Sequence, residues 1–139
     1  MEGFRFVYSQ PVEFRDLDAL GHLNNAAYLS YVESARVAYM QEVLGPLELE
    51  ELGIVAEARI AFRVSSLLGE TLAIGMRVAE IGGKSFRFEF EIHGGDGRLV
   101  ADGSTVHVTF DYATLISIPV PDHWRRKIDA YETRSYATT

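Results

Sequence analysis

The side chains best suited to chemistry lie close together in residues 13–25, with the sequence EFRDLDALGHLNN. Asp18 offers a carboxylate and His22 an imidazole, and Asn24 and Asn25 precede a stretch with helical spacing. A carboxylate can attack an electrophile or activate a water molecule. The start of a helix adds unpaired N–H groups and the positive end of the helix dipole, which stabilise a developing oxyanion. The cluster therefore combines an attacking group with an oxyanion site.

The same residues also have purely structural explanations. Asp16 and Asp18 can terminate a strand, and Gly21 can form the turn that follows. Asn24 or Asn25 can cap the helix. The residue types alone leave both interpretations open.

Several familiar kinds of site are excluded by the composition and the motifs. The chain has no cysteine, so disulfides, thiolate zinc sites and a cysteine nucleophile are ruled out. It has no G-x-G-x-x-G run, no Walker-type loop and no G-x-S-x-G elbow. Asp18 and His22 would supply only two ligands to a metal ion, which leaves such a site incomplete. We therefore expect neither a metal nor a cofactor.

The elements that position the cluster follow from the hydrophobic spacing. Residues 5–14 favour a strand at a sheet edge or with a bulge, because Pro11 cannot donate to a central ladder. A turn over residues 15–21 leads to a predicted helix over residues 25–44, which ends before Gly45-Pro46. One face of this helix carries apolar residues at steps of three and four: Tyr28, Val32, Ala35, Tyr39 and Val43.

The second half of the chain changes to a period of two. Residues 41–58 hold five glutamates and no Lys or Arg, which indicates a surface connection with one helical turn. From Ala58 onward, apolar alternation predicts four strands over 60–64, 72–78, 86–92 and 100–110. Short glycine-bearing links favour antiparallel hairpins, so we expect a meander. A short helix is predicted from Asp122 through Tyr131.

These elements predict an α+β fold in which one long central helix is wrapped by an antiparallel sheet of about five strands. The length of 139 residues suits one domain over residues 1–139. Such a sheet has two free edges, and Phe and Val positions on both strand parities indicate a partly apolar second face. We therefore expect a homo-oligomer built on a dimer, and a homotetramer if dimers pair.

Composition limits the partners and the location. Because 13 basic residues face 20 acidic ones, for a net charge of -7, nucleic acid binding is disfavoured. No apolar stretch approaches the roughly 20 residues of a membrane helix, so no membrane span is expected. The first ten residues lack the apolar core of a signal peptide, and we expect a soluble cytoplasmic protein.

The cluster also resembles a known signature. Asp18-x-x-Gly21-His22-x-Asn24-Asn25-x-x-Tyr28, followed by Glu33-Ser34-Ala35-Arg36, is similar to that of the hotdog-fold thioesterases of the 4-hydroxybenzoyl-CoA and acyl-CoA thioesterase group. Gly69-Glu70, Gly83-Lys84-Ser85 and Gly97-Arg98 fit the strand pattern of that family as well. The resemblance covers roughly residues 5–111.

The resemblance implies hydrolysis of an acyl thioester of coenzyme A or of an acyl carrier protein. Asp18 would be the nucleophile or general base, His22 would orient the carbonyl or a water, and the helix N-terminus would polarise the thioester. Substrate contacts are expected from Gly21, Asn24, Asn25, Tyr28 and Ser85. Tyr28 also fits a core aromatic, and Ser85 fits a hairpin hydroxyl.

Some residues depart from this pattern or allow alternatives. One subgroup of the family has a Tyr and a His where this chain has Phe14 and Asn25. Which residue assists Asp18, and which acyl group the substrate carries, therefore stay open. Glu33 could instead be the catalytic carboxylate, as in a second hotdog lineage. The main alternative function is that of a non-catalytic acyl-thioester binding protein. A hydratase on the same fold is a third possibility, but the Asp18 motif lacks the Asn-Pro-Leu-His type of run expected of those enzymes. Candidate cations for the CoA phosphates are Arg59, Arg63, Lys84, Arg87 and residues 125–127.

Overall fold

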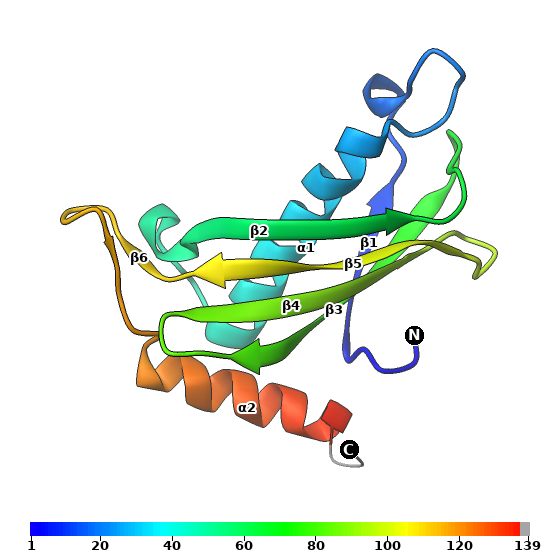
Figure 1. The fold of residues 1–139 in the computed structure, drawn as a ribbon. Coiled ribbons are helices and arrows are strands. Elements are labelled where there is room, and N and C mark those ends of the chain that lie inside the picture. The colour runs from blue at the N-terminus through cyan, green and yellow to red at the C-terminus, as the bar shows by residue number, and fades with distance from the viewer. Residues whose placement is uncertain (137–139) are drawn as a thin grey trace.

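A five-stranded antiparallel sheet with a long helix across one face forms the body of the protein (Figure 1). The computed structural model describes the backbone of residues 1–136 and the side chains of residues 1–132. The strands are β1 (Phe6–Pro11), β2 (Ile54–Phe62), β3 (Thr71–Ile81), β4 (Ser85–His93) and β5 (Leu99–Val108), arranged in the order β1-β3-β4-β5-β2. This arrangement confirms the predicted α+β class and places β1 at an edge, as Pro11 indicated.

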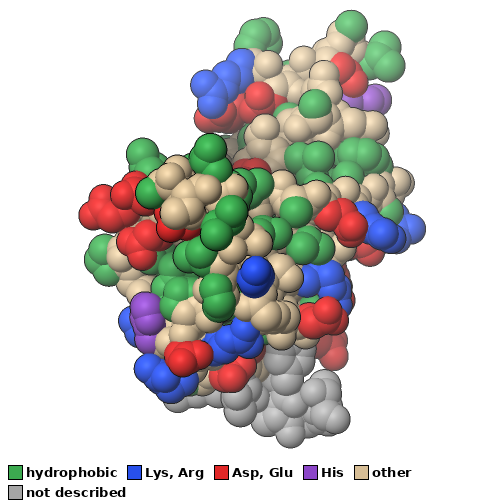
Figure 2. All heavy atoms as spheres, turned by 60° about the vertical axis from the view of Figure 1, so that its left-hand side comes forward, with side chains coloured by type: hydrophobic (Ala, Val, Ile, Leu, Met, Phe, Trp, Pro, Cys, Tyr) green, Lys and Arg blue, Asp and Glu red, His purple; other side chains and the backbone are tan. Residues whose placement is uncertain are grey.

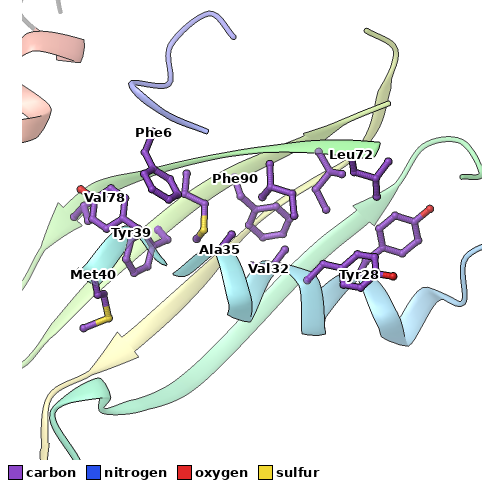
Figure 3. Close-up of a cluster of buried hydrophobic side chains, with 14 of the residues drawn as sticks. Phe6, Tyr28, Val32, Ala35, Tyr39, Met40, Leu72, Val78 and Phe90 are labelled. Carbon is purple, nitrogen blue, oxygen red and sulfur yellow. The ribbon is translucent and has the colours of Figure 1, made fainter. Parts of the chain in front are cut away.

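The long helix α1 (Asn25–Leu44) has the predicted bounds. Asn24 caps it, because its side-chain Oδ1 accepts the N–H of Ala26 at 2.9 Å. The predicted apolar stripe faces the sheet, and Figure 3 shows its aromatic and small residues among strand side chains. The stripe packs on the alternating phenylalanines of β4, and the rings of Tyr39 and Phe88 lie 5.1 Å apart.

The strand order corrects two expectations about β2. Only β3, β4 and β5 form a meander, because β2 pairs with β5 instead of β3. β2 also begins at Ile54, inside the predicted connection, after the single helical turn η2 (Leu49–Leu52). Most residues of β2 are exposed because it is an edge strand, so no clear inside-outside alternation marked its start.

The C-terminal part differs in two ways from the prediction. The last predicted strand divides at Thr109, and a small hairpin of β6 (Phe110–Asp111) and β7 (Ile116–Ser117) follows. The second helix, α2 (Asp122–Tyr136), is longer than expected. It buries Trp124 and Ile128 against the body of the protein. Over residues 1–136, no helix is both long enough and apolar enough to cross a membrane.

The outer face of the sheet is charged at its centre, contrary to the expected apolar second face. β4 turns Phe86, Phe88 and Phe90 inward, and its alternate residues form ion pairs on the outer face. Glu89 accepts from Arg77 at 2.9 Å and from Arg87 at 3.1 Å. The expected partly apolar second face is therefore not found at the centre of the sheet, and the exposed Val7 lies next to the buried Phe6 on the edge strand β1.

Candidate active site

Asp18 lies in a tight turn between η1 (Phe14–Asp16) and α1. Its N–H donates to the carbonyl of His22 at 2.7 Å, and the φ of +79° at Gly21 is one that glycine adopts without strain. Asp18 Oδ1 accepts the N–H groups of Leu20 at 2.9 Å and His22 at 3.1 Å. Asp18 Oδ2 has no hydrogen-bond partner among the described residues. The carboxylate thus holds the turn with one oxygen and keeps the other available.

The backbone N–H groups beside Asp18 are almost all used inside the protein. The N–H groups of Gly21 and His22 donate to Asp18 itself. The N–H of Leu23 donates to the carbonyl of Ser66 at 2.9 Å. The N–H of Asn24 donates to the carbonyl of Asp16 at 2.8 Å. The N–H of Asn25 has no acceptor in the described part of the chain. Of the N–H groups from Gly21 to Asn25, it is therefore the one left to donate to an oxyanion.

A cavity of about 230 Å³ lies beside the turn. Four predicted site residues line it: Asp18, His22, Asn25 and Tyr28. The other wall comes from Leu23 and from residues 62–65, at the end of β2 and in the loop that follows. Of these residues, the sequence indicated only Arg63, as a candidate cation for CoA phosphates. Their place beside Asp18 could not be predicted because they lie far from Asp18 along the chain.

Tyr28 forms the buried wall of this cavity. It is 2% exposed, its hydroxyl donates to Ser66 Oγ at 3.0 Å, and its ring meets Phe62 edge-on at 5.6 Å. Burial raises the pKa of Tyr28, so its hydroxyl stays protonated. Tyr28 is therefore both the core aromatic and the cavity residue that the sequence suggested.

Three predicted contacts are not among the residues that line this cavity. Gly21 forms the turn, where its N–H donates to the carbonyl of Asp18 at 3.1 Å. The side chain of Asn24 serves as the helix cap. Ser85 begins β4 opposite Val108, which pairs in turn with Ile54. Because Phe62 lies at the other end of β2 from Ile54, Ser85 is at the opposite end of the sheet from Asp18 (Figure 1). Its place is the β3–β4 hairpin, where its carbonyl accepts the N–H of Gly82 at 2.7 Å.

An ion pair supports the loop that walls the cavity. Arg98 binds Glu70 at 2.7 Å, and its Nη2 donates to the carbonyl of Ser65 at 2.8 Å. Glu70 in turn accepts the N–H of Leu67 at 2.7 Å. The hydrogen bond from Arg98 lowers the pKa of Glu70. Both residues belong to segments that resemble the family, but nothing in the sequence showed that they meet.

Glu33, the alternative catalytic carboxylate, is engaged elsewhere. Its two oxygens accept from Nε and Nη2 of Arg36 at 3.1 and 3.0 Å, and it does not line the Asp18 cavity. Arg36 is buried and also donates to the carbonyl of Leu52 at 3.0 Å. Its Nη1 lies 3.0 Å from Nδ1 of His107. Glu33 therefore has a structural role: it holds Arg36, and Arg36 links α1 to Leu52 of η2.

His107 makes the stability of the protein depend on pH. Burial and the adjacent Arg36 lower its pKa from 6.5 to about 3. Between these values the unfolded chain binds a proton that the folded chain does not. The free energy of unfolding should therefore fall, by up to about 1.4 kcal/mol per pH unit, as the pH drops from about 6.5 toward 3. Urea unfolding of the wild type and of His107→Gln across this window measures that slope.

We expect a shallower slope for His107→Gln than for the wild type. The matched control is His123→Gln, which changes an exposed histidine of α2 and should leave the slope unchanged. Equal slopes for the wild type and His107→Gln would contradict the assignment.

Among the candidate cations for CoA phosphates, Arg63 alone lines the Asp18 cavity. It also pairs with Asp102 at 3.0 Å. Arg59 and Arg87 are paired with glutamates on the sheet. Across the described side chains, no group of three or more His, Asp or Glu residues could hold a metal ion.

Comparisons with known proteins identify the family and the fold of the chain. Residues 12–128 match the Thioesterase-like superfamily. A search of curated proteins gave no match. A solved thioesterase from Thermus thermophilus, in complex with coenzyme A and Zn, is 38% identical, with a TM-score of 0.88 over 96% of this chain and 98% of that chain.

Two more distant structures share the fold. A 1,4-dihydroxy-2-naphthoyl-CoA thioesterase from Synechocystis is 21% identical, with a TM-score of 0.78 over 88% of this chain and 94% of that chain. A Staphylococcus aureus protein in complex with CoA is 18% identical, with a TM-score of 0.81 over 91% and 82% of the two chains.

The superfamily match spans most of the chain, including the Asp18 turn, α1 and four strands of the main sheet, β2 to β5. The expected membership in a hotdog thioesterase family is therefore confirmed at the level of the superfamily. The chain belongs to the Thioesterase-like superfamily, has the hotdog fold and is a thioester hydrolase.

Proposed function

We propose that the protein hydrolyses acyl-CoA thioesters in the Asp18 cavity. The observation that carries this proposal is a pair of unused groups: Oδ2 of Asp18 and the N–H of Asn25 have no partners within the described part of the chain, and both residues line the same cavity. The Thermus thermophilus relative was solved with coenzyme A, which favours coenzyme A over a carrier protein as the thiol.

The chemistry requires an attacking oxygen and a stabilised oxyanion. Asp18 either attacks the thioester carbonyl or takes a proton from a water that attacks it. The N–H of Asn25, at the positive end of α1, stabilises the negative charge on the carbonyl oxygen. His22 orients the carbonyl or the water. Either route ends with a free acid and a free thiol.

The test is a thiol-release assay on a panel of acyl-CoA esters of increasing length, together with aromatic acyl-CoAs. We expect turnover on at least one of them, and faster turnover with CoA than with the same acyl group on a carrier protein. Binding of these esters without detectable thiol release would contradict hydrolysis at this site.

Metal chelators should leave the thioesterase activity unchanged. Asp18 and His22 are the only carboxylate and imidazole that line the cavity, and two ligands leave a metal site incomplete. Activity measured after dialysis against a chelator should equal that of the untreated enzyme. Loss of turnover that one divalent ion restores would instead place Asp18 in a metal site.

We also propose that the protein is a homodimer joined through β2. In the proposed register, Ala58 of β2 faces Ala58 of the partner subunit and the two strands run antiparallel. This register sets Ile54 opposite Phe62 of the partner subunit. Both are exposed apolar residues, at 37% and 44%. The same register sets Glu57 opposite Arg59 of the partner subunit. Pairing would extend the sheet and remove its free edge. A tetramer would form from two such dimers.

This pairing would place a groove of one subunit beside the Asp18 cavity of the other. An apolar groove of about 700 Å³ lies by η2 at the start of β2 and includes Phe110, Tyr112 and Trp124. Figure 2 looks onto this side of the molecule, where hydrophobic side chains gather with acidic ones beside them. The Asp18 cavity lies at the other end of β2. Because antiparallel strands bring opposite ends together, the groove of each subunit would adjoin the Asp18 cavity of its partner.

A further inference from the structure

A buried tyrosine of α1 reaches back to the segment that precedes Asp18. The Tyr31 hydroxyl donates to Oδ2 of Asp16 at 2.7 Å and accepts the N–H of Glu13 at 3.1 Å. Tyr31 is 5% exposed and lies on the buried face of α1. Neither Tyr31 nor Asp16 lines the Asp18 cavity, so neither is placed to contact a substrate there.

Asp16 is joined to α1 at two points. Its side chain is held by Tyr31, and its carbonyl accepts the N–H of Asn24, which is the residue that caps the helix. Asp18 lies two residues further on. Its carboxylate accepts hydrogen bonds from N–H groups of its own turn, those of Leu20 and His22, and so does not tie the turn to α1. The contacts of Asp16 therefore determine where this turn stands relative to the start of α1.

We propose that Tyr31 and Asp16 are positioning residues that hold the carboxylate of Asp18 at its working distance from the N–H of Asn25. The inference rests on the proposed function, because it matters for turnover only if these two groups act on the same substrate. A displacement of about 1 Å in such a site can lower turnover by about 10²-fold. Burial, followed by the hydrogen bond with Asp16, raises the pKa of Tyr31 to about 12, so the hydroxyl remains a donor over the working pH range.

Steady-state kinetics of Tyr31→Phe on the best acyl-CoA substrate test the proposal. We expect kcat to fall by about 10- to 100-fold with KM changed by less than about threefold, because the lost bond affects alignment and not substrate contact. Asp16→Asn retains an oxygen that can accept from Tyr31 and should keep most of the activity. Asp16→Ala should lower kcat in the same range. The double variant should be no worse than Tyr31→Phe alone, because Tyr31→Phe already removes the bond to Asp16 together with the acceptor of the Glu13 N–H.

Tyr39→Phe is the matched control. Tyr39 also lies on α1 and donates to a carboxylate, that of Glu132, at 2.6 Å, but the contact joins α1 to α2 away from the Asp18 turn. This variant should lower the thermal midpoint and leave kcat unchanged. Unchanged kcat in Tyr31→Phe, or a loss that appears only as a raised KM, would overturn the proposal.

The outcome for Asp18 separates failure of this inference from failure of the proposed function. If Asp18→Asn loses turnover and Tyr31→Phe does not, the positioning role is wrong and the proposed function stands. If the wild type hydrolyses no thioester, or Asp18→Asn remains fully active, the proposed function fails and the positioning role fails with it. Thermal unfolding of each variant shows whether a loss of kcat arises from an unfolded fraction.

Discussion

Asp18→Asn is expected to lower kcat by about 10²- to 10⁴-fold while folding and substrate affinity stay near those of the wild type. The asparagine oxygen can still accept the N–H groups of Leu20 and His22, which hold the turn at 2.9 and 3.1 Å. Its amide can neither attack a carbonyl nor take a proton from water. Thiol-release kinetics, a thermal melt and a binding titration on the same substrate measure the three quantities.

Two further variants make this result specific. Asp18→Ala should be equally inactive but less stable, because it also removes the acceptor for both N–H groups of the turn. His22→Ala should cost less turnover than Asp18→Asn, since the N–H of Asn25 would still stabilise the oxyanion. An Asp18→Asn variant with wild-type turnover beside an inactive His22→Ala variant would make His22 the base. Loss of affinity in both variants without hydrolysis by the parent would favour a binding protein.

Single-turnover hydrolysis in ¹⁸O-labelled water should separate the two roles of Asp18. Nucleophilic attack forms an acyl anhydride with Asp18, and water that attacks its aspartyl carbonyl leaves the label in the Asp18 carboxylate. General-base catalysis places the label only in the released acid, as does an anhydride opened by water at the acyl carbonyl, so label in the Asp18 carboxylate is the result that identifies nucleophilic attack. Mass spectrometry of the peptide that contains Asp18 gives the answer.

Ala58→Glu should break the proposed dimer and reduce activity with it. Ala58 is exposed, at the centre of the proposed pairing, where it would face Ala58 of the partner subunit. Two glutamates opposite each other repel, and like charges at directly opposed strand positions are destabilising. We expect the dissociation constant of the dimer to rise by at least about tenfold, which corresponds to about 1.4 kcal/mol. Sedimentation equilibrium and activity across a dilution series should change together.

The matched control is Ala58→Gln, which adds a side chain of nearly the same size without the charge. It should remain a dimer and keep its activity, and higher salt should partly restore the Glu variant because exposed charges are screened. A parent protein that sediments as a fully active monomer would contradict the dimer. An Ala58→Glu variant that stays dimeric at every concentration would contradict pairing at this register.

Local elements with strong hydrophobic periodicity could be predicted from the amino-acid sequence alone. The bounds of α1 could be predicted because a cap, a continuous apolar stripe and a Gly-Pro stop agree with each other. β4 was equally clear, since its phenylalanines alternate with charged residues. One short motif was enough to predict four residues of the cavity: Asp18, His22, Asn25 and Tyr28. They lie within a tight turn and the start of α1, where residues close in sequence are also close in space.

Contacts between segments far apart along the chain could not be predicted in this way. An edge strand such as β2 has no periodic burial, so neither its start at Ile54 nor its partner β5 could be read from the sequence. The wall of the cavity at residues 62–65 and its support by Arg98 follow from that pairing. The backbone hydrogen bonds decided the last point, because they occupy the N–H groups from Gly21 to Asn24 and leave that of Asn25 available. Residue types at a loop show which groups are present, but only the folded chain fixes which of them are already bonded.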